Sequence, residues 1–219
     1  MGAERDMWIA SVVSEHGDEI RNADPASQLS MRPNPRAWNR WFEEESTVID
    51  VVETFKNGVT RPDLHSFVRN SDLSSTQGRR SAFIATLVWG VGSTNRYYGR
   101  HKRLLTSAGL DGALEESYSH LREGNTEAAF VAMDPLPGIT FRFHTKWLWV
   151  VGSALKVQPL PLIFDNRVMN GLRGLAWPEM TRRQSQSSRW SRYIEDSHAV
   201  ASSLGVTSEH VELWLFDRE

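Results

Sequence analysis

Two short segments of this 219-residue sequence contain residues whose types and spacing could bind an anion or hold a carboxylate in a fixed place. The first, Leu136-Pro137-Gly138-Ile139, is a tight hairpin between two helix-like segments, and Thr140 follows it. In the second, Asp165 stands where a helix over 166–175 is expected to begin. Backbone N–H groups at a helix start donate hydrogen bonds to a phosphate, and the helix dipole favours negative charge there. The hairpin therefore predicts a phosphate site, although a plain helix–helix connector has the same composition.

Charge is distributed unevenly along the chain, although the net charge is only −2. The first 60 residues carry an excess of acids, and the remainder carries an excess of Lys and Arg. Arg96, Arg100, Lys102 and Arg103 stand together without an acid, and residues 166–191 form a second basic stretch. Such stretches either contact phosphate or form solvated helix faces, and the sequence leaves both interpretations open.

The residue types exclude several classes of chemistry. Cysteine is absent, which excludes disulfides, iron–sulfur clusters, thiolate zinc sites and thiol catalysis. The seven His are scattered without a paired ligand motif, so no metal site is expected. Gly90-Val91-Gly92 lacks the third glycine of a dinucleotide loop, and neither a phosphate-loop lysine nor a Gly-x-Ser-x-Gly elbow occurs. No metal or cofactor is therefore predicted.

Hydrophobic spacing predicts that helices position these segments, and strand signals are weak, so we expect an all-α protein. Residues 17–36 contain three X-Pro steps and are expected to form a loop. Trp38 and Trp41 are expected to pack in the core. A helix is expected from about 37 to 56, and a short turn or helix at 61–68. The other expected helical segments are about 81–91, 94–106, 113–121, 127–133, 141–151, 166–175, 178–204 and 208–216. Without a signal peptide or a membrane-length apolar run, the protein is expected to be soluble and cytoplasmic, with no membrane contact.

Taken together, these segments resemble the helix-hairpin-helix DNA glycosylase superfamily, and most closely its 8-oxoguanine DNA glycosylase branch. The resemblance rests on the Leu-Pro-Gly-Ile hairpin, on Lys146 with Asp165 19 residues later, and on the C-terminal Leu215-Phe216-Asp217. It is strongest over residues 127–175 and extends diffusely over 36–219, with residues 1–35 as a partly irregular N-terminal extension. It implies a multi-helix, all-α glycosylase fold with the helix-hairpin-helix at about 127–152.

The sequence departs from the family pattern at two positions of the hairpin. The second glycine of the usual hairpin is replaced here by Thr140. The usual lysine lies about four residues after the first glycine, where this chain has Arg142, and Lys146 comes four residues later still. Either the hairpin is longer in this branch and Lys146 still points into the site, or the protein has no lysine nucleophile. The aspartate match is the firmer of the two.

The resemblance implies an enzyme that flips a modified base out of double-stranded DNA and cleaves its N-glycosidic bond. Asp165 would stabilise the positive charge that develops on the sugar, and Lys146 would attack C1′ and add strand-lyase activity. A C-terminal Phe of this kind stacks on the extruded base. The implied DNA contacts are Pro137, Gly138, Ile139, Thr140, Arg142, Arg96, Arg100, Lys102, Arg103 and Arg167. The residues expected to line the base pocket are Trp89, Tyr97, Tyr98, Trp147 and Phe216.

The substrate and two rival functions stay open at the level of the sequence. Oxidised guanine is implied by the family branch, whereas the altered hairpin leaves room for other bases, including hypermodified pyrimidines of viral DNA. Such a substrate would suggest a role in phage defence rather than housekeeping repair. A monomer is expected. The rivals are a non-catalytic DNA-binding protein with the same fold and an unrelated α-helical interaction domain.

Overall fold

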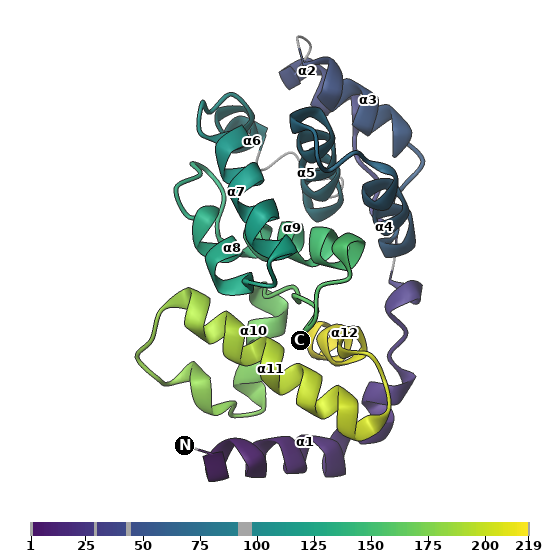
Figure 1. Ribbon diagram of the computed structural model, residues 1–219. Helices are drawn as coiled ribbons and strands as arrows, with labels where there is room; N and C mark the ends of the chain where they lie inside the picture. Colours follow the sequence, from purple (N-terminus) through teal and green to yellow (C-terminus); the bar gives the residue numbers. More distant parts are fainter. Residues whose placement is uncertain (1, 29, 43–44, 92–97, 219) are drawn as a thin grey trace.

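The computed structural model describes residues 2–28, 30–42, 45–91 and 98–218, and in these ranges the chain forms helices and no strand (Figure 1). The prediction of an all-α protein is therefore confirmed. The α-helices are α1 (Gly2–Asn22), α2 (Pro35–Phe42), α3 (Ser46–Thr54), α4 (Arg61–Asn70), α5 (Thr76–Val91), α6 (Tyr98–Leu105), α7 (Leu110–Arg122), α8 (Thr126–Ala132), α9 (Phe141–Leu155), α10 (Asn166–Gly174), α11 (Gln186–Leu204) and α12 (Ser208–Asp217). Two short 3₁₀ helices, η1 (Pro25–Ser27) and η2 (Pro178–Met180), complete the elements.

Helix α9 runs through the middle of the fold, and it is apolar on nearly all sides. Its stretch from Trp147 to Val151 is fully buried, because α4, α5, α7 and α8 all pack against it (Figure 1). The two buried indoles are also satisfied as donors: Trp147 Nε1 donates to Ser117 Oγ at 2.9 Å, and Trp149 Nε1 donates to Glu209 at 2.9 Å. Burial of each large apolar side chain stabilises the fold by about 1.5–3 kcal/mol. Helix α9 is therefore a rigid support for residues on its first turns.

Four sequence expectations were wrong in detail. Residues 37–56 form two helices, α2 and α3, instead of one. Residues 17–22 belong to α1 rather than to a loop, because Ile20 continues the buried four-residue spacing of Trp8 and Val12. Residues 178–204 form η2 and α11 instead of one helix, since Ser185 caps α11 by accepting from the Ser188 N–H.

Trp41 was expected in the core, but its side chain is 43% exposed. Trp38 and Phe42 instead share the buried face of α2.

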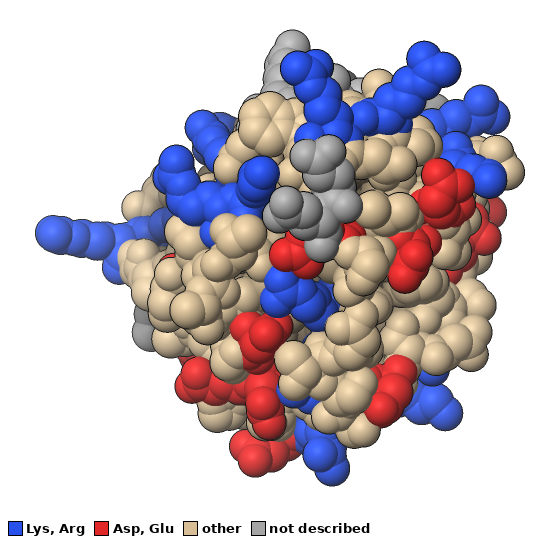
Figure 2. All heavy atoms as spheres, turned by 90° about the horizontal axis from the view of Figure 1, so that it is seen from above, with Lys and Arg blue, Asp and Glu red and all other residues tan. Residues whose placement is uncertain are grey.

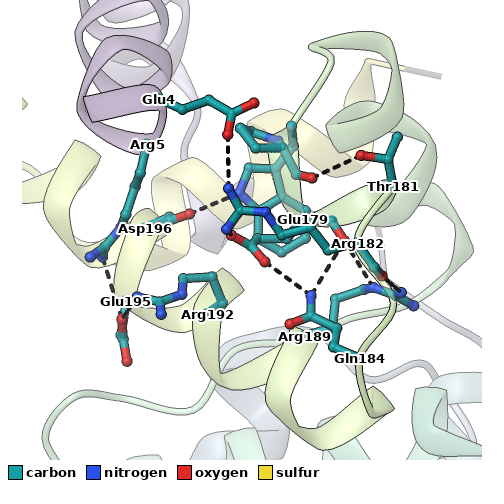
Figure 3. A network of polar contacts seen from close by, with 12 residues as sticks. Glu4, Arg5, Glu179, Thr181, Arg182, Gln184, Arg189, Arg192, Glu195 and Asp196 are labelled. Carbon is teal, nitrogen blue, oxygen red and sulfur yellow. Dashed lines mark hydrogen bonds and ion pairs between the residues drawn. The ribbon is translucent and has the colours of Figure 1, made fainter. Parts of the chain in front are cut away.

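Helix α1 is fastened to the C-terminal helices by a polar network (Figure 3). Arg5 is paired with Asp196 of α11, and the same carboxylate accepts from Trp177 Nε1 at 2.8 Å. Arg182 joins Glu4 of α1, at 2.8 Å, to Glu179 of η2. These contacts tie α1 to the half of the molecule that contains α11 and α12.

Helices α10 and α12 pack unusually closely, and a glycine makes this approach possible. A Cβ atom on Gly171 would lie 2.4 Å from the backbone oxygen of Leu215. Because neither the Gly171 backbone nor the Leu215 backbone can move freely, only glycine fits there. The contact brings the start of α10 to the end of α12, where the guanidinium carbon of Arg167 lies 4.0 Å from the centre of the Phe216 ring and both Asp165 and Phe216 line one cavity.

We predict that Gly171→Ala destabilises the protein by about 1–3 kcal/mol, since the added methyl group overpacks a backbone contact. Gly174→Ala is the matched control on the same helix, because a Cβ there meets nothing within 4 Å. It should leave stability unchanged or raise it slightly, as alanine favours helix. Urea unfolding of the two variants measures the difference. Equal midpoints would contradict the close packing of α10 on α12.

Candidate active site

Asp165 begins α10 and is its N-cap, as the sequence predicts. Its Oδ1 accepts hydrogen bonds from the backbone N–H groups of Arg167 at 3.1 Å and Val168 at 3.3 Å. These bonds satisfy two of the donors that every helix start leaves free. Because one carboxylate oxygen is held in this way, the other, Oδ2, is fixed in direction.

Lys146 lies on the second turn of α9 and meets that second oxygen. Its Nζ donates to Asp165 Oδ2 at 3.0 Å, and the two side chains are only 11% and 14% exposed. A neighbouring bond fixes the same two segments, since Phe164 N–H donates to Thr145 Oγ1 at 3.0 Å. The sequence-predicted pair is therefore brought together by two adjacent contacts between α9 and the loop before α10.

The surroundings keep Asp165 ionised. Burial acts to raise the pKa of its carboxyl group, but the charge and hydrogen bond of Lys146 and the two backbone N–H groups outweigh it. The net effect is a pKa below the ordinary value of 3.8. Lys146 Nζ also lies 5.2 Å from the centre of the Trp89 ring, a cation–π distance. Gly90 leaves room for the lysine, because a Cβ there would lie 3.3 Å from Lys146 Cδ.

Two hollows meet at this ion pair. The larger is a cavity of about 470 Å³, with Trp89, Arg61, Glu212 and Phe216 among its lining residues. The smaller, of about 260 Å³, is lined by the hairpin residues and by α6. Lys146 and Asp165 line both hollows. A molecule with one group in each hollow would therefore have its connecting atoms beside the lysine and the aspartate.

The hairpin between α8 and α9 forms part of the smaller hollow. Gly138 has a φ of +81°, which favours glycine, and a Cβ there would lie 2.9 Å from the backbone oxygen of Arg100. The residues of the hairpin segment that line the hollow are Gly138, Ile139, Thr140 and Arg142, and Pro137 precedes them half-buried. The hairpin is thus pressed against α6, with the start of α9 open to the hollow.

The model of one protein family, described as "Putative 8-oxoguanine DNA glycosylase OGG-like protein", matches residues 24–216. The chain belongs to this family. No curated protein and no solved structure matches it. The match begins at residue 24, within the predicted N-terminal extension of residues 1–35.

Of the pocket residues expected for this OGG-like chain, two line the larger cavity. These are Trp89, which stacks on Trp149 at 5.5 Å, and the half-buried Phe216. Tyr98 and Trp147 instead lie in the core, where Tyr98 packs edge-on against Trp38 and Trp147 against Phe83. Tyr97 falls outside the described residues.

The expected DNA-contacting cations occupy different places. Arg100 lines the smaller hollow, and Lys102 and Arg103 are exposed on the same helix, α6. Figure 2 shows both basic and acidic side chains on the face seen from above, the side on which α2 and α6 lie in Figure 1, with Lys and Arg most frequent along its upper and left edges. Arg167 lies between the hollows with its guanidinium carbon 4.0 Å from the centre of the Phe216 ring. Arg96 falls outside the described residues.

Sequence reasoning missed a second buried ion pair beside the cavity, between Arg61 and Glu212. Both residues are buried, and Glu212 also accepts from the Ile163 N–H at 3.1 Å. Burial raises the pKa of the Glu212 carboxyl group, and Arg61 opposes that effect. The two residues are 151 positions apart on helices without a shared motif. A lone Arg or Glu on an amphipathic helix carries no sequence signal of burial.

The described residues contain neither a candidate metal site nor a candidate membrane span. No group of three or more His, Asp or Glu side chains in them is arranged to hold a metal ion. None of the helices that the structure describes combines the length and apolarity that a membrane span requires.

We predict that Asp165→Asn lowers the free energy of unfolding at pH 7 by about 3 kcal/mol, because Lys146 is left charged and mostly buried. The amide oxygen still caps α10, so the loss reports on the ion pair. Folding lowers the pKa of Asp165 below its ordinary value of 3.8. The stability that its carboxylate contributes is therefore complete when the pH is above 3.8, and it is lost as the pH falls through the lower pKa of the folded state. Denaturant unfolding at several pH values should show the two proteins converging in acid.

Asp18→Asn is the matched control for this experiment. Asp18 pairs with Arg21 at 2.7 Å, but its side chain is 94% exposed. Such a pair contributes little, so the variant should unfold like the parent at every pH. If the free energies of unfolding of the parent and Asp165→Asn differed by the same amount down to strongly acidic pH, the assigned ion pair would be contradicted.

Proposed function

We propose that the protein is a DNA glycosylase that binds double-stranded DNA, extrudes a modified base and cleaves its N-glycosidic bond. The observation that carries the proposal is the Lys146–Asp165 pair at the meeting point of the two hollows. The family match over residues 24–216 supports the same conclusion. A base inside a duplex is inaccessible, so the enzyme must take it out of the stack before any chemistry.

In this proposal each hollow takes one part of the nucleotide. The larger cavity receives the base, with Trp89 and Phe216 as aromatic walls. The smaller hollow receives a backbone phosphate at the start of α9, where N–H groups and the helix dipole favour an anion. The sugar that joins them would then place C1′ beside Lys146 and Asp165.

The roles of the two residues follow from their chemistry. As the N-glycosidic bond breaks, its electron pair leaves with the base and positive charge develops on the sugar. The ionised Asp165 stabilises that charge from a fixed position. Lys146 gives a proton to the departing base and forms the bond to C1′ through the freed Nζ electron pair. Opening of the sugar ring at the C1′–O4′ bond then gives a Schiff base, which allows strand cleavage.

Oxidised guanine is the first substrate to test, because the family description names 8-oxoguanine. Other modified bases, including hypermodified pyrimidines, belong in the same screen, which measures free-base release by mass spectrometry. A phage-derived base as the preferred substrate would assign the protein to defence, and an oxidised base would assign it to repair.

We predict that wild type releases a free base from at least one of these DNAs and that Asp165→Asn releases it at least about 100-fold more slowly. Lys146→Gln should abolish strand cleavage. Lys56→Gln is the control, since Lys56 is 55% exposed and pairs with Glu53 on α3. Lys56→Gln should release the base and cleave the strand at the wild-type rates. Release by Asp165→Asn at the wild-type rate would remove Asp165 from the mechanism.

We further predict that duplex binding depends on salt and that α6 contributes to this dependence. Lys102→Gln should reduce the slope of log K against log salt by about 0.9, the value for one phosphate contact. Arg192→Gln is the control, because the Arg192 side chain on α11 is 39% exposed and already pairs with Glu195. Filter binding or fluorescence anisotropy at several salt concentrations measures the slopes. An unchanged slope for Lys102→Gln would exclude this residue from the DNA surface.

A further inference from the structure

One wall of the larger cavity comes from the segment between α1 and α2, far in sequence from Lys146 and Asp165. Ser27, Gln28 and Met31 line the cavity there. Asp24 begins the segment by capping η1 through the Ala26 N–H, at 2.9 Å. Met31 ends it by exchanging two backbone hydrogen bonds of 2.9 Å with Val59. The wall is therefore fixed at both ends.

The Gln28 side chain in this wall is held in one orientation. Its Oε1 accepts a hydrogen bond of 2.6 Å from Arg61 Nε. An arginine guanidinium only donates, so the amide oxygen, and not the amide nitrogen, must face it. Arg61 is itself immobile, because it is 3% exposed, paired with Glu212 and stacked 4.8 Å from the centre of the Trp149 ring. The direction of the carboxamide is thus set by a buried ion pair.

This arrangement leaves the amide nitrogen of Gln28 available. Nε2 forms no hydrogen bond with any residue that the structure describes, and the side chain is only half-buried in the cavity wall. Both oxygens of Glu212 are engaged elsewhere, since Oε1 is paired with Arg61 and Oε2 accepts from the Ile163 N–H. The wall around Gln28 therefore presents a donor whose two hydrogens need an acceptor.

We propose that Gln28 is a specificity-determining residue that donates from Nε2 to a carbonyl oxygen or an unprotonated ring nitrogen of the extruded base. The inference rests on the proposed function, since it takes the larger cavity as the base pocket. A base with an exocyclic amino group at this position would place its own donor opposite the Gln28 Nε2 donor, and no hydrogen bond could form between them. Leaving a polar group of the pocket unpaired costs affinity, so such a base would be rejected.

Gln28→Glu tests this assignment directly. The carboxylate keeps an acceptor for Arg61 and nearly the same shape, but it replaces the free donor by an acceptor. The probes are two duplexes, one containing 8-oxoguanine on a 2′-fluorinated sugar that resists cleavage and one containing a tetrahydrofuran abasic analogue. Wild type should bind the 8-oxoguanine duplex more tightly than the abasic one. Gln28→Glu should lose about 10- to 100-fold in affinity for the 8-oxoguanine duplex and none for the abasic duplex. Gln77→Glu is the control with the same charge change, because Gln77 is exposed and bonds to Thr47.

The outcomes separate this proposal from the proposed function. Equal affinities of wild type for the two duplexes, or wild-type behaviour of Gln28→Glu, would overturn the role of Gln28. A parallel loss on both duplexes would also overturn it, because it would mean a structural role. Failure of wild type to release any base in the substrate screen would refute glycosylase activity, while the binding difference would still decide whether Gln28 reads a base.

Discussion

The ion pair between Lys146 and Asp165 joins the central helix α9 to the start of α10, and neither charge is stable there alone. Both side chains are mostly buried, so each needs the other to offset the loss of hydration. The two backbone N–H groups that Asp165 caps hold the carboxylate in place while Lys146 approaches from the other side. Gly90 makes room for the lysine stem, and Gly171 lets α10 reach α12. The geometry of the site is thus built into the packing of the helices.

Behind this pair lies a second one, between Arg61 and Glu212, which fixes the cavity wall. Arg61 stacks on Trp149 and lies 5.8 Å from the Trp89 ring, so the aromatic wall and the buried charges stabilise each other. The same arginine orients Gln28. A cavity whose polar groups are already oriented needs little rearrangement when a ligand enters, which favours selective binding. Four distant segments, η1, α4, α5 and α12, therefore act as one wall.

Local sequence patterns predicted the parts of the site that depend on local structure. Asp165 could be assigned because a helix N-cap leaves a clear signature, and the hairpin because Pro and Gly limit the backbone. Lys146 was instead singled out by the resemblance to the helix-hairpin-helix glycosylases and not by a local pattern of its own. In contrast, whether an aromatic residue faces a cavity or the core depends on which helices surround it. Trp147 and Tyr98 therefore looked like pocket residues, although both are core residues. Arg61 and Gln28 were missed because only the tertiary fold brings them together.

The most direct test of the account is to locate the covalent bond between protein and DNA. Wild-type protein would be mixed with a duplex from which it releases a base, trapped with borohydride, digested and sequenced by mass spectrometry. The account predicts a single adduct, on the Nζ of Lys146. An adduct at another amine, or base release without any adduct, would contradict the role given to the Lys146–Asp165 pair.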